Sequence, residues 1–274
     1  MNVNSYLNIL AIKATIKNNE KEWIQKSIEA IFQRLKKYDR DKNRIDKKFI
    51  FGSYKRGTII SRYFDNNSDI DIMVVFGKKF GGFYNFDPAN EIKKPQTYLN
   101  YLKDFAESNY PRSEIYQSYP TIVLELNHIK FELVPAISDI FGNFKIPNKP
   151  HWYQIQDWIF TNPSDLDGIL KSNCNLKRLV IIAKVWNAKQ GYIYPSYELE
   201  KWITQQYFCG NLAEFFYSFC ELLPIDHNLS QEKINIIKKI KESAKNAKIH
   251  NDSLCMESLF EYKAEPVRSE ETKC

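Results

Sequence analysis

The stretch FGSYKRGT (residues 51–58), followed by SDIDIMVVF (residues 68–76), decides the fold of this chain. The first part is a small-residue turn after a short apolar run. The second part is an apolar strand that carries two carboxylates near its start. Side chains alternate between the two faces of a strand, so Asp69 and Asp71 point the same way. Two carboxylates on one face are costly unless something positive lies between them.

A divalent cation would meet that need. Mg²⁺ binds carboxylate oxygens and completes its shell with water and substrate phosphates. The turn at Gly52 gives backbone N–H groups room to approach a phosphate, and Ser53 adds a hydroxyl group. A phosphate-binding turn joined to a metal-binding pair is what nucleotidyl transfer requires. The plain alternative is an ordinary loop followed by a strand with acidic caps.

The composition sets broad limits on the class of protein. The chain has 274 residues and 43% hydrophobic content, which predicts one large domain or two closely packed ones. No run approaches the roughly 18 apolar residues of a membrane helix, and no signal peptide is evident, so we expect a cytoplasmic protein. The five cysteines form no Cys-x-x-Cys motif and predict neither disulfides nor a zinc site. A net charge of +6 suits anionic substrates or nucleic acid, and equally a solvated surface.

Hydrophobic spacing predicts the elements of the first half. Apolar residues at helical intervals indicate helices over 21–38 and 97–108. The charged segment 38–48 is expected to be a connector, and 77–94 a loop. Residues 121–126 and 129–136 are two apolar runs around a short polar turn, which predicts a hairpin. On its second strand Lys130 and Glu132 alternate with apolar residues and point away from their face.

The second half changes character after residue 142. A turn-rich bridge over 142–163 is expected to lead into helices at 176–190, 197–208, 212–223 and 231–249. Pro195 and Ser196 predict a helix start with the serine as cap. The last helix is rich in lysine and could bind a polyanion. We interpret these lysines instead as a solvated face. The four histidines show no metal-ligand spacing. A loose tail is expected from about residue 256.

Two motifs resemble a known superfamily. The Gly-Ser turn followed by Asp-x-Asp on a strand resembles the DNA polymerase β-like nucleotidyltransferases. The segment FELVPA (131–136) resembles the strand that carries their third carboxylate, except that Glu132 stands where aspartate is usual. LKRLVIIAKVWN (176–187) and SYELE (196–200) resemble the helical half of the CD-NTases. These are the cGAS/DncV-like enzymes of bacterial anti-phage CBASS signalling.

The resemblance implies a fold and a division of the chain. It implies an α+β protein whose nucleotidyltransferase core is a mixed sheet with flanking helices. A C-terminal helical lobe of the oligoadenylate synthase type would complete a bilobed molecule with the active site in the cleft. The expected core spans residues 1–150 and includes the long N-terminal helix, and the helical domain spans 151–274.

The resemblance also assigns roles in the core. Gly52 and Ser53 would hold the donor triphosphate. Two Mg²⁺ ions, or Mn²⁺ in their place, would be bound by Asp69, Asp71 and Glu132. Glu132 could instead be a solvated strand residue. Lys55 and Arg56 follow the turn and could touch a phosphate, but we expect them to be exposed side chains.

In the helical lobe the resemblance selects three residues. Lys184 would reach the donor phosphates, Ser196 would contact the terminal phosphate, and Tyr197 would stack on the base. Lys184 could instead be an ordinary surface lysine, and Tyr197 could be part of the core.

The implied activity is Mg²⁺-dependent synthesis of a cyclic di- or trinucleotide second messenger from NTPs, by two-metal in-line transfer. The partners would be the NTP substrates and a downstream effector that binds the product. We expect a monomer without the zinc ribbon with which animal cGAS engages DNA. Two alternatives stay open. One is a nucleotidyltransferase that modifies a tRNA end or a protein hydroxyl, and the other is a degenerate nucleotide- or RNA-binding module.

Overall fold

The computed structural model describes residues 1–77, 92–139, 141–148 and 157–260. The chain divides into two compact units. The sheet unit contains residues 16–62 and 66–172, and the helical unit contains residues 1–15, residues 63–65 and the chain from Asn173 onward. This division differs from the predicted one, because the first fifteen residues group with the helices and the helical part begins at 173 rather than 151.

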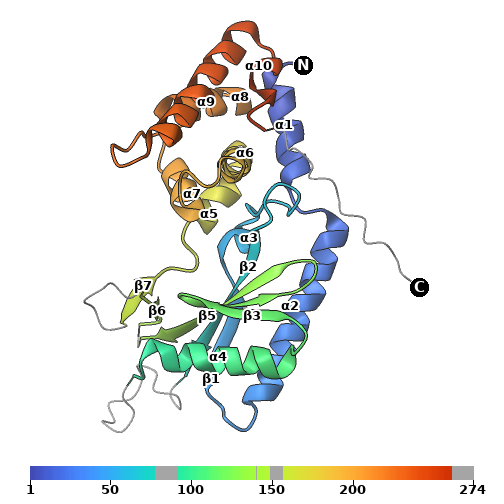
Figure 1. Cartoon of the computed structure of the whole chain (residues 1–274), viewed down its shortest axis with the longest axis vertical. Helices are drawn as coiled ribbons and strands as arrows, with labels where there is room; N and C mark the ends of the chain where they lie inside the picture. Colours follow the sequence, from blue (N-terminus) through green and yellow to red (C-terminus); the bar gives the residue numbers. More distant parts are fainter. Residues whose placement is uncertain (78–91, 140, 149–156, 261–274) are drawn as a thin grey trace. The chain divides into compact units, whose positions relative to one another are not determined.

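The sheet unit is built on a mixed seven-stranded sheet (Figure 1). The main path runs β1-β2-β5-β4-β3, and β6 and β7 extend it from β5. β2 and β5 are parallel, and every other described pair is antiparallel. The strands are β1 (Ile45–Ile50), β2 (Asp69–Phe76), β3 (Glu114–Ser118), β4 (Thr121–Glu125), β5 (Lys130–Ser138), β6 (Phe144–Pro147) and β7 (Trp158–Thr161).

Helices α2 (Asn18–Asp39) and α4 (Pro95–Asn109) cover one face of this sheet (Figure 1). Each presents an apolar stripe at helical spacing to the strands, and that stripe supplies the main core. The stripe of α2 consists of Ile24, Ile28, Ile31 and Leu35, all buried. The sheet side chains that it meets alternate along β2 and β5 and include Ile70, Ile72, Phe131 and Leu133.

The opposite face of the sheet has a smaller apolar cluster. Met73, Val75 and Ala136 are buried there against partly buried side chains of β1, β6 and the residue after β1. Because side chains alternate along a strand, Asp69 and Asp71 continue the row of Met73 and Val75. The acidic start of β2 therefore lies on the face that α2 and α4 do not cover.

The helical unit packs around one central helix. The helix α6 (Cys174–Lys189) contacts α1 (Val3–Ala14), α7 (Ser196–Thr204) and α8 (Leu212–Leu222). These contacts leave most of its residues buried, as expected for a helix with neighbours on several sides. The unit is completed by α9 (Gln231–His250) and α10 (Leu254–Glu257). None of the described helices is long and apolar enough to cross a membrane.

The long periodic helices and the hairpin at 121–136 agree with the prediction. Several expectations were wrong. The connector at 38–48 contains the start of β1, and the bridge at 142–163 contains the β6–β7 hairpin. The predicted loose tail contains the end of α10, and its residues Met256 and Phe260 are buried in the helical unit. Most of the predicted 77–94 loop, and the tail from 261, lie outside the described residues.

Candidate functional site

Four charged side chains of β2 and β5 lie next to one another on the face of the sheet that α2 and α4 do not cover. β2 and β5 pair in parallel register, with Asp69 opposite Lys130 and Asp71 opposite Glu132. Because neighbouring strands pleat in phase, paired residues point to the same face. We call this set, Asp69, Asp71, Lys130 and Glu132, the carboxylate face. The prediction that Glu132 points away from the faces of Phe131 and Leu133 agrees with the burial of those two side chains.

Lys130 lies among these carboxylates. Its Nζ is 3.5 Å from Oδ2 of Asp69 and 3.6 Å from Oε1 of Glu132. Burial alone would lower the pKa of Lys130, but the charges of Asp69 and Glu132 more than offset it and raise this pKa above its ordinary value. The lysine therefore stays protonated and offsets the repulsion between the carboxylates.

Gly52 brings the Gly-Ser turn beside Asp71. It begins the short helix α3 (Gly52–Arg56), with φ +68°, and the N–H of Phe51 donates a hydrogen bond to the carbonyl of Asp71 (3.1 Å). A Cβ atom at residue 52 would lie 1.9 Å from Oδ2 of Asp71. The glycine is therefore required by its backbone conformation and by the carboxylate packed against it. Ser53 is the next residue along the turn after this contact.

Replacing Gly52 by alanine is expected to destabilise the protein by about 1–3 kcal/mol, because it adds a clash with Asp71 to the strain of a positive φ. Gly191 is a matched control, since its φ is +69° and no atom lies within 4 Å of an added Cβ. Denaturant unfolding of Gly52→Ala and Gly191→Ala measures both effects. Equal losses of stability in the two variants would show that the Asp71 contact contributes nothing.

The two basic residues after the turn differ from each other. Nζ of Lys55 is 2.9 Å from Oδ2 of Asp167. The same ammonium donates a longer hydrogen bond of 3.3 Å to the hydroxyl of Ser164. Arg56 is buried, so the prediction of an exposed side chain is wrong for this residue. Lys55 is exposed as predicted but already engaged in an ion pair.

The helical unit holds the other three predicted residues. Lys184, on α6, is buried and its Nζ is 3.0 Å from Oε2 of the fully buried Glu200, so it is not a surface lysine. Ser196 is the first residue of α7 and makes no cap hydrogen bond, because Pro195 occupies the cap position. Tyr197 is 40% exposed, so it is not part of the core. Nζ of Lys201 lies 5.9 Å from the centre of its ring.

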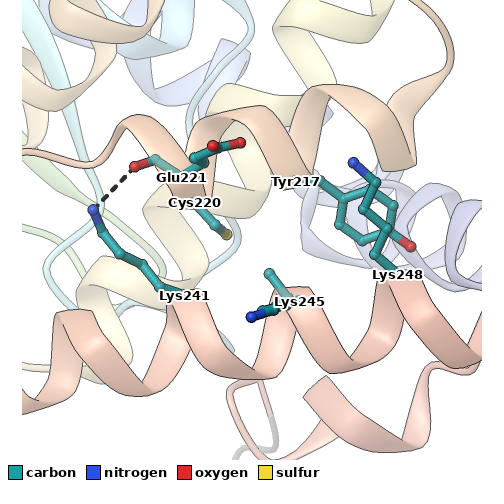
Figure 2. A pocket seen from close by; sticks show the side chains of 7 residues that line it. Tyr217, Cys220, Glu221, Lys241, Lys245 and Lys248 are labelled. Carbon is teal, nitrogen blue, oxygen red and sulfur yellow. Dashed lines mark hydrogen bonds between the residues drawn. The ribbon is translucent and has the colours of Figure 1, made fainter.

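A basic hollow of about 420 Å³ opens along α8 and α9 in the helical unit (Figure 2). Its lining includes three lysines, Lys241, Lys245 and Lys248, and one acidic residue, Glu221, together with Tyr217 and the buried Cys220. Lys241 donates a hydrogen bond to the carbonyl of residue 221 (3.0 Å), and the ammonium of Lys248 lies 5.7 Å from the centre of the Tyr217 ring. Since Lys245 and Lys248 are exposed, the interpretation of this helix as a solvated face stays our prediction.

The carboxylate face has the chemistry of a divalent-cation site. In the described ranges, no three His, Cys, Asp or Glu side chains are grouped so that they could hold a metal ion as they stand. The donors nevertheless fit Mg²⁺, because Asp69, Asp71 and Glu132 offer carboxylate oxygens from one face of two paired strands, with Asp71 opposite Glu132. In this structure the ammonium of Lys130 supplies the positive charge that the carboxylates require.

Comparison with known families identifies the chain. The family described as Second Messenger Oligonucleotide or Dinucleotide Synthetase domain (SMODS) matches residues 1–173. The chain belongs to the SMODS family. It is therefore a nucleotidyltransferase of the type that makes oligonucleotide second messengers, and the predicted CD-NTase membership is confirmed. No curated protein matches the chain.

Solved structures share the fold of this SMODS protein. The Bradyrhizobium diazoefficiens CD-NTase CdnG in complex with GTP has a TM-score of 0.70 at 12% identity, and the match covers 94% of this chain and 95% of that one. E. coli MS115-1 CdnC with ATP has a TM-score of 0.61 at 13% identity, covering 92% of each chain. Escherichia coli DncV bound to 3'-deoxy GTP has a TM-score of 0.60 at 8% identity, covering 85% and 86%. The predicted α+β class, with a mixed sheet, flanking helices and a C-terminal helical region, is confirmed.

Two residues that form ion pairs with the predicted site residues of this SMODS protein were not predicted from the sequence. Lys130 was predicted to share a face with Glu132 but was given no role, although the strand alternation already placed it there. Glu200, the buried partner of Lys184, had no signal beyond its place in the SYELE segment.

Proposed function

We propose that this SMODS protein joins NTPs into a cyclic di- or trinucleotide in a Mg²⁺-dependent reaction, and that the product signals in anti-phage defence through a separate effector. The observation that carries the proposal is the carboxylate face. Asp71 pairs with Glu132 across β2 and β5, Asp69 lies two residues before Asp71 on the same face, and Gly52 of the Gly-Ser turn packs against Asp71. Family membership supports the reaction class, and the CD-NTase resemblance supports the role in defence.

Each residue has a defined task in this proposal. Asp69, Asp71 and Glu132 would hold two Mg²⁺ ions, and the turn at Gly52 and Ser53 would bind the donor triphosphate. Bound Mg²⁺ would activate the attacking hydroxyl and neutralise charge on the leaving pyrophosphate. The ribose hydroxyl oxygen forms a bond to the α-phosphorus and loses its proton, and the bond to pyrophosphate breaks. A second transfer of the same kind closes the ring.

Product analysis tests the proposal. The purified protein is incubated with Mg²⁺ and each mixture of labelled NTPs, treated with phosphatase, and the products are separated by chromatography. A small phosphatase-resistant nucleotide supports cyclic synthesis. Label on added tRNA or on protein would favour the alternative nucleotidyltransferase, and absence of any transfer would favour a binding module.

We also propose that Ser196 and Tyr197 contribute to NTP binding from the start of α7. The exposed Tyr197 ring offers a stacking surface for a base, and such a contact is worth about 1–3 kcal/mol. Tyr197→Ala is therefore expected to weaken NTP binding by roughly tenfold, and Ser196→Ala to weaken it less. Calorimetric titration measures both. Tyr207→Ala removes a ring that is 87% exposed and serves as the control. Unchanged affinity in Tyr197→Ala would remove the ring from the binding site.

The predicted role of Lys184, to bind the donor phosphates, stays a prediction. Its ammonium is held by Glu200 within the helical unit, so a contact with donor phosphates would share or break that ion pair. A buried lysine that loses its partner is strongly unfavourable, whereas a phosphate could replace the carboxylate.

A further inference from the structure

We propose that Lys130 is the built-in counter-ion of the carboxylate face. Its ammonium holds the metal-free carboxylates together and has to be displaced before a divalent cation binds between them. Lys130 is thus a positioning residue that sets the metal affinity of the site. The inference rests on the proposed function in taking the carboxylates as metal ligands.

The position of the ammonium carries the inference. It lies within ion-pair distance of Asp69 on β2 and of Glu132 on its own strand. A divalent cation bound to these same oxygens would be only a few ångströms from it, and two positive charges at such a separation repel strongly in a partly buried site. The lysine side chain is only 16% exposed, so water screens this repulsion weakly. The ammonium and the metal ion therefore compete for the same carboxylates.

The ion pairs of Lys130 are loose enough to be broken. Tight charge-assisted N–H···O bonds are about 2.7–2.9 Å long. The two distances here are 3.5 and 3.6 Å. The lysine thus supplies charge without a short bond to either carboxylate. Displacing the ammonium costs electrostatic energy. The stronger attraction between the carboxylates and a divalent cation can offset this cost.

The neighbouring strand offers the displaced ammonium a second acceptor. Glu125 on β4 stands directly opposite Lys130 in antiparallel register, so the two side chains are on one face and close together. The carboxylate of Glu125 accepts a hydrogen bond from the hydroxyl of Tyr116 on β3 (3.0 Å). A carboxylate fixed in this way can receive Lys130 on the side away from Asp69. We infer that Lys130 turns from Asp69 and Glu132 toward Glu125 when the cation binds.

Direct measurement of metal binding tests the proposal without any enzymatic readout. Mn²⁺ alone is titrated into the full chain without nucleotide, and binding is followed by calorimetry. Lys130→Met removes the charge and keeps the length of the side chain, and it is expected to bind Mn²⁺ at least tenfold more tightly than the wild type. Glu125→Gln is expected to bind Mn²⁺ less tightly, because the displaced lysine loses its acceptor.

Two controls separate charge from shape. Lys130→Arg keeps the charge and is expected to stay within about threefold of the wild-type affinity. Lys103→Met removes a half-buried lysine of α4 that pairs with Glu107. Because α4 covers the other face of the sheet, this change should leave Mn²⁺ binding unchanged. The melting temperature supplies a second measurement. In EDTA, Lys130→Met is expected to melt below the wild type, and Mn²⁺ should raise its melting temperature by more.

Several results would overturn the inference. These are Mn²⁺ binding by Lys130→Met that is equal to or weaker than that of the wild type, no binding by either protein, or tighter binding by Lys130→Arg as well. Lys130→Gln replaces the methionine variant if that protein does not fold. Failure of the proposed function appears elsewhere, as the absence of a cyclic product, so the two failures are distinguishable.

Discussion

Replacing Asp69 and Asp71 together by asparagine is expected to abolish nucleotide incorporation while the protein stays folded. Both carboxylates lie on the open face of β2, on the side of the sheet away from α2 and α4, so the main core is untouched. Asparagine is nearly the same size as aspartate but brings no negative charge to a divalent cation. Product formation from labelled NTPs measures the effect, and circular dichroism verifies the fold.

The matched control for this double variant removes two charges elsewhere in the sheet unit. Asp104→Asn with Glu107→Gln changes two exposed carboxylates on α4, which packs on the opposite face of the sheet. This variant should retain wild-type activity, which separates the loss of net charge from the loss of ligands. Wild-type product formation by the Asp69/Asp71 variant would show that the carboxylate face is not the active site.

Elements with strong local signals could be predicted from the sequence. The regular apolar spacing of α2 shows which face of the helix is buried. The apolar residues of β2 and β5 likewise predict two buried strands. Alternation along these strands also placed Asp69 and Asp71 on one face, and the register now sets Glu132 beside Asp71. These signals are local because a helix or strand repeats its pattern every few residues.

Elements without such a signal could not be predicted. The strands β6 and β7 have four residues each, too few to show alternation, and they are separated by a long segment in the sequence. The burial of Met256 and Phe260 depends on other helices of the unit, which composition cannot reveal. Ser196 carried a helix-start signal, but Pro195 took the cap position and left serine inside the helix.

The site shows the same limit. The sequence predicted that Gly52 makes room for a phosphate, and this role stays a prediction. The structure shows that the glycine makes room for the Asp71 carboxylate. The sequence placed Lys130 on the face of Glu132, but its ion pair with Asp69 needs the parallel pairing of two strands more than fifty residues apart in the chain. Tertiary contacts of this kind leave no periodic signal.

Glu132→Gln is expected to slow the chemical step by roughly a hundredfold, a loss of about 2.7 kcal/mol of transition-state stabilisation. In the family pattern this position holds the third carboxylate, here a glutamate in place of the usual aspartate. In a two-metal scheme the third carboxylate serves the ion that activates the attacking hydroxyl. Its loss should therefore harm the chemical step more than NTP binding, which Asp69 and Asp71 still support.

The length of the side chain decides how the result is interpreted. Glutamate reaches one methylene farther than aspartate, so the carboxylate can meet the same ion from a strand that sits slightly back. Glu132→Asp keeps the charge but shortens this reach, and it is expected to retain partial activity. Glu114→Gln, an exposed carboxylate on the edge strand β3, is the control and should match the wild type. Single-turnover rates at saturating NTP separate chemistry from binding in all three variants. If Glu132→Gln is as fast as the wild type, Glu132 is only a solvated strand residue, and two carboxylates alone hold the metal.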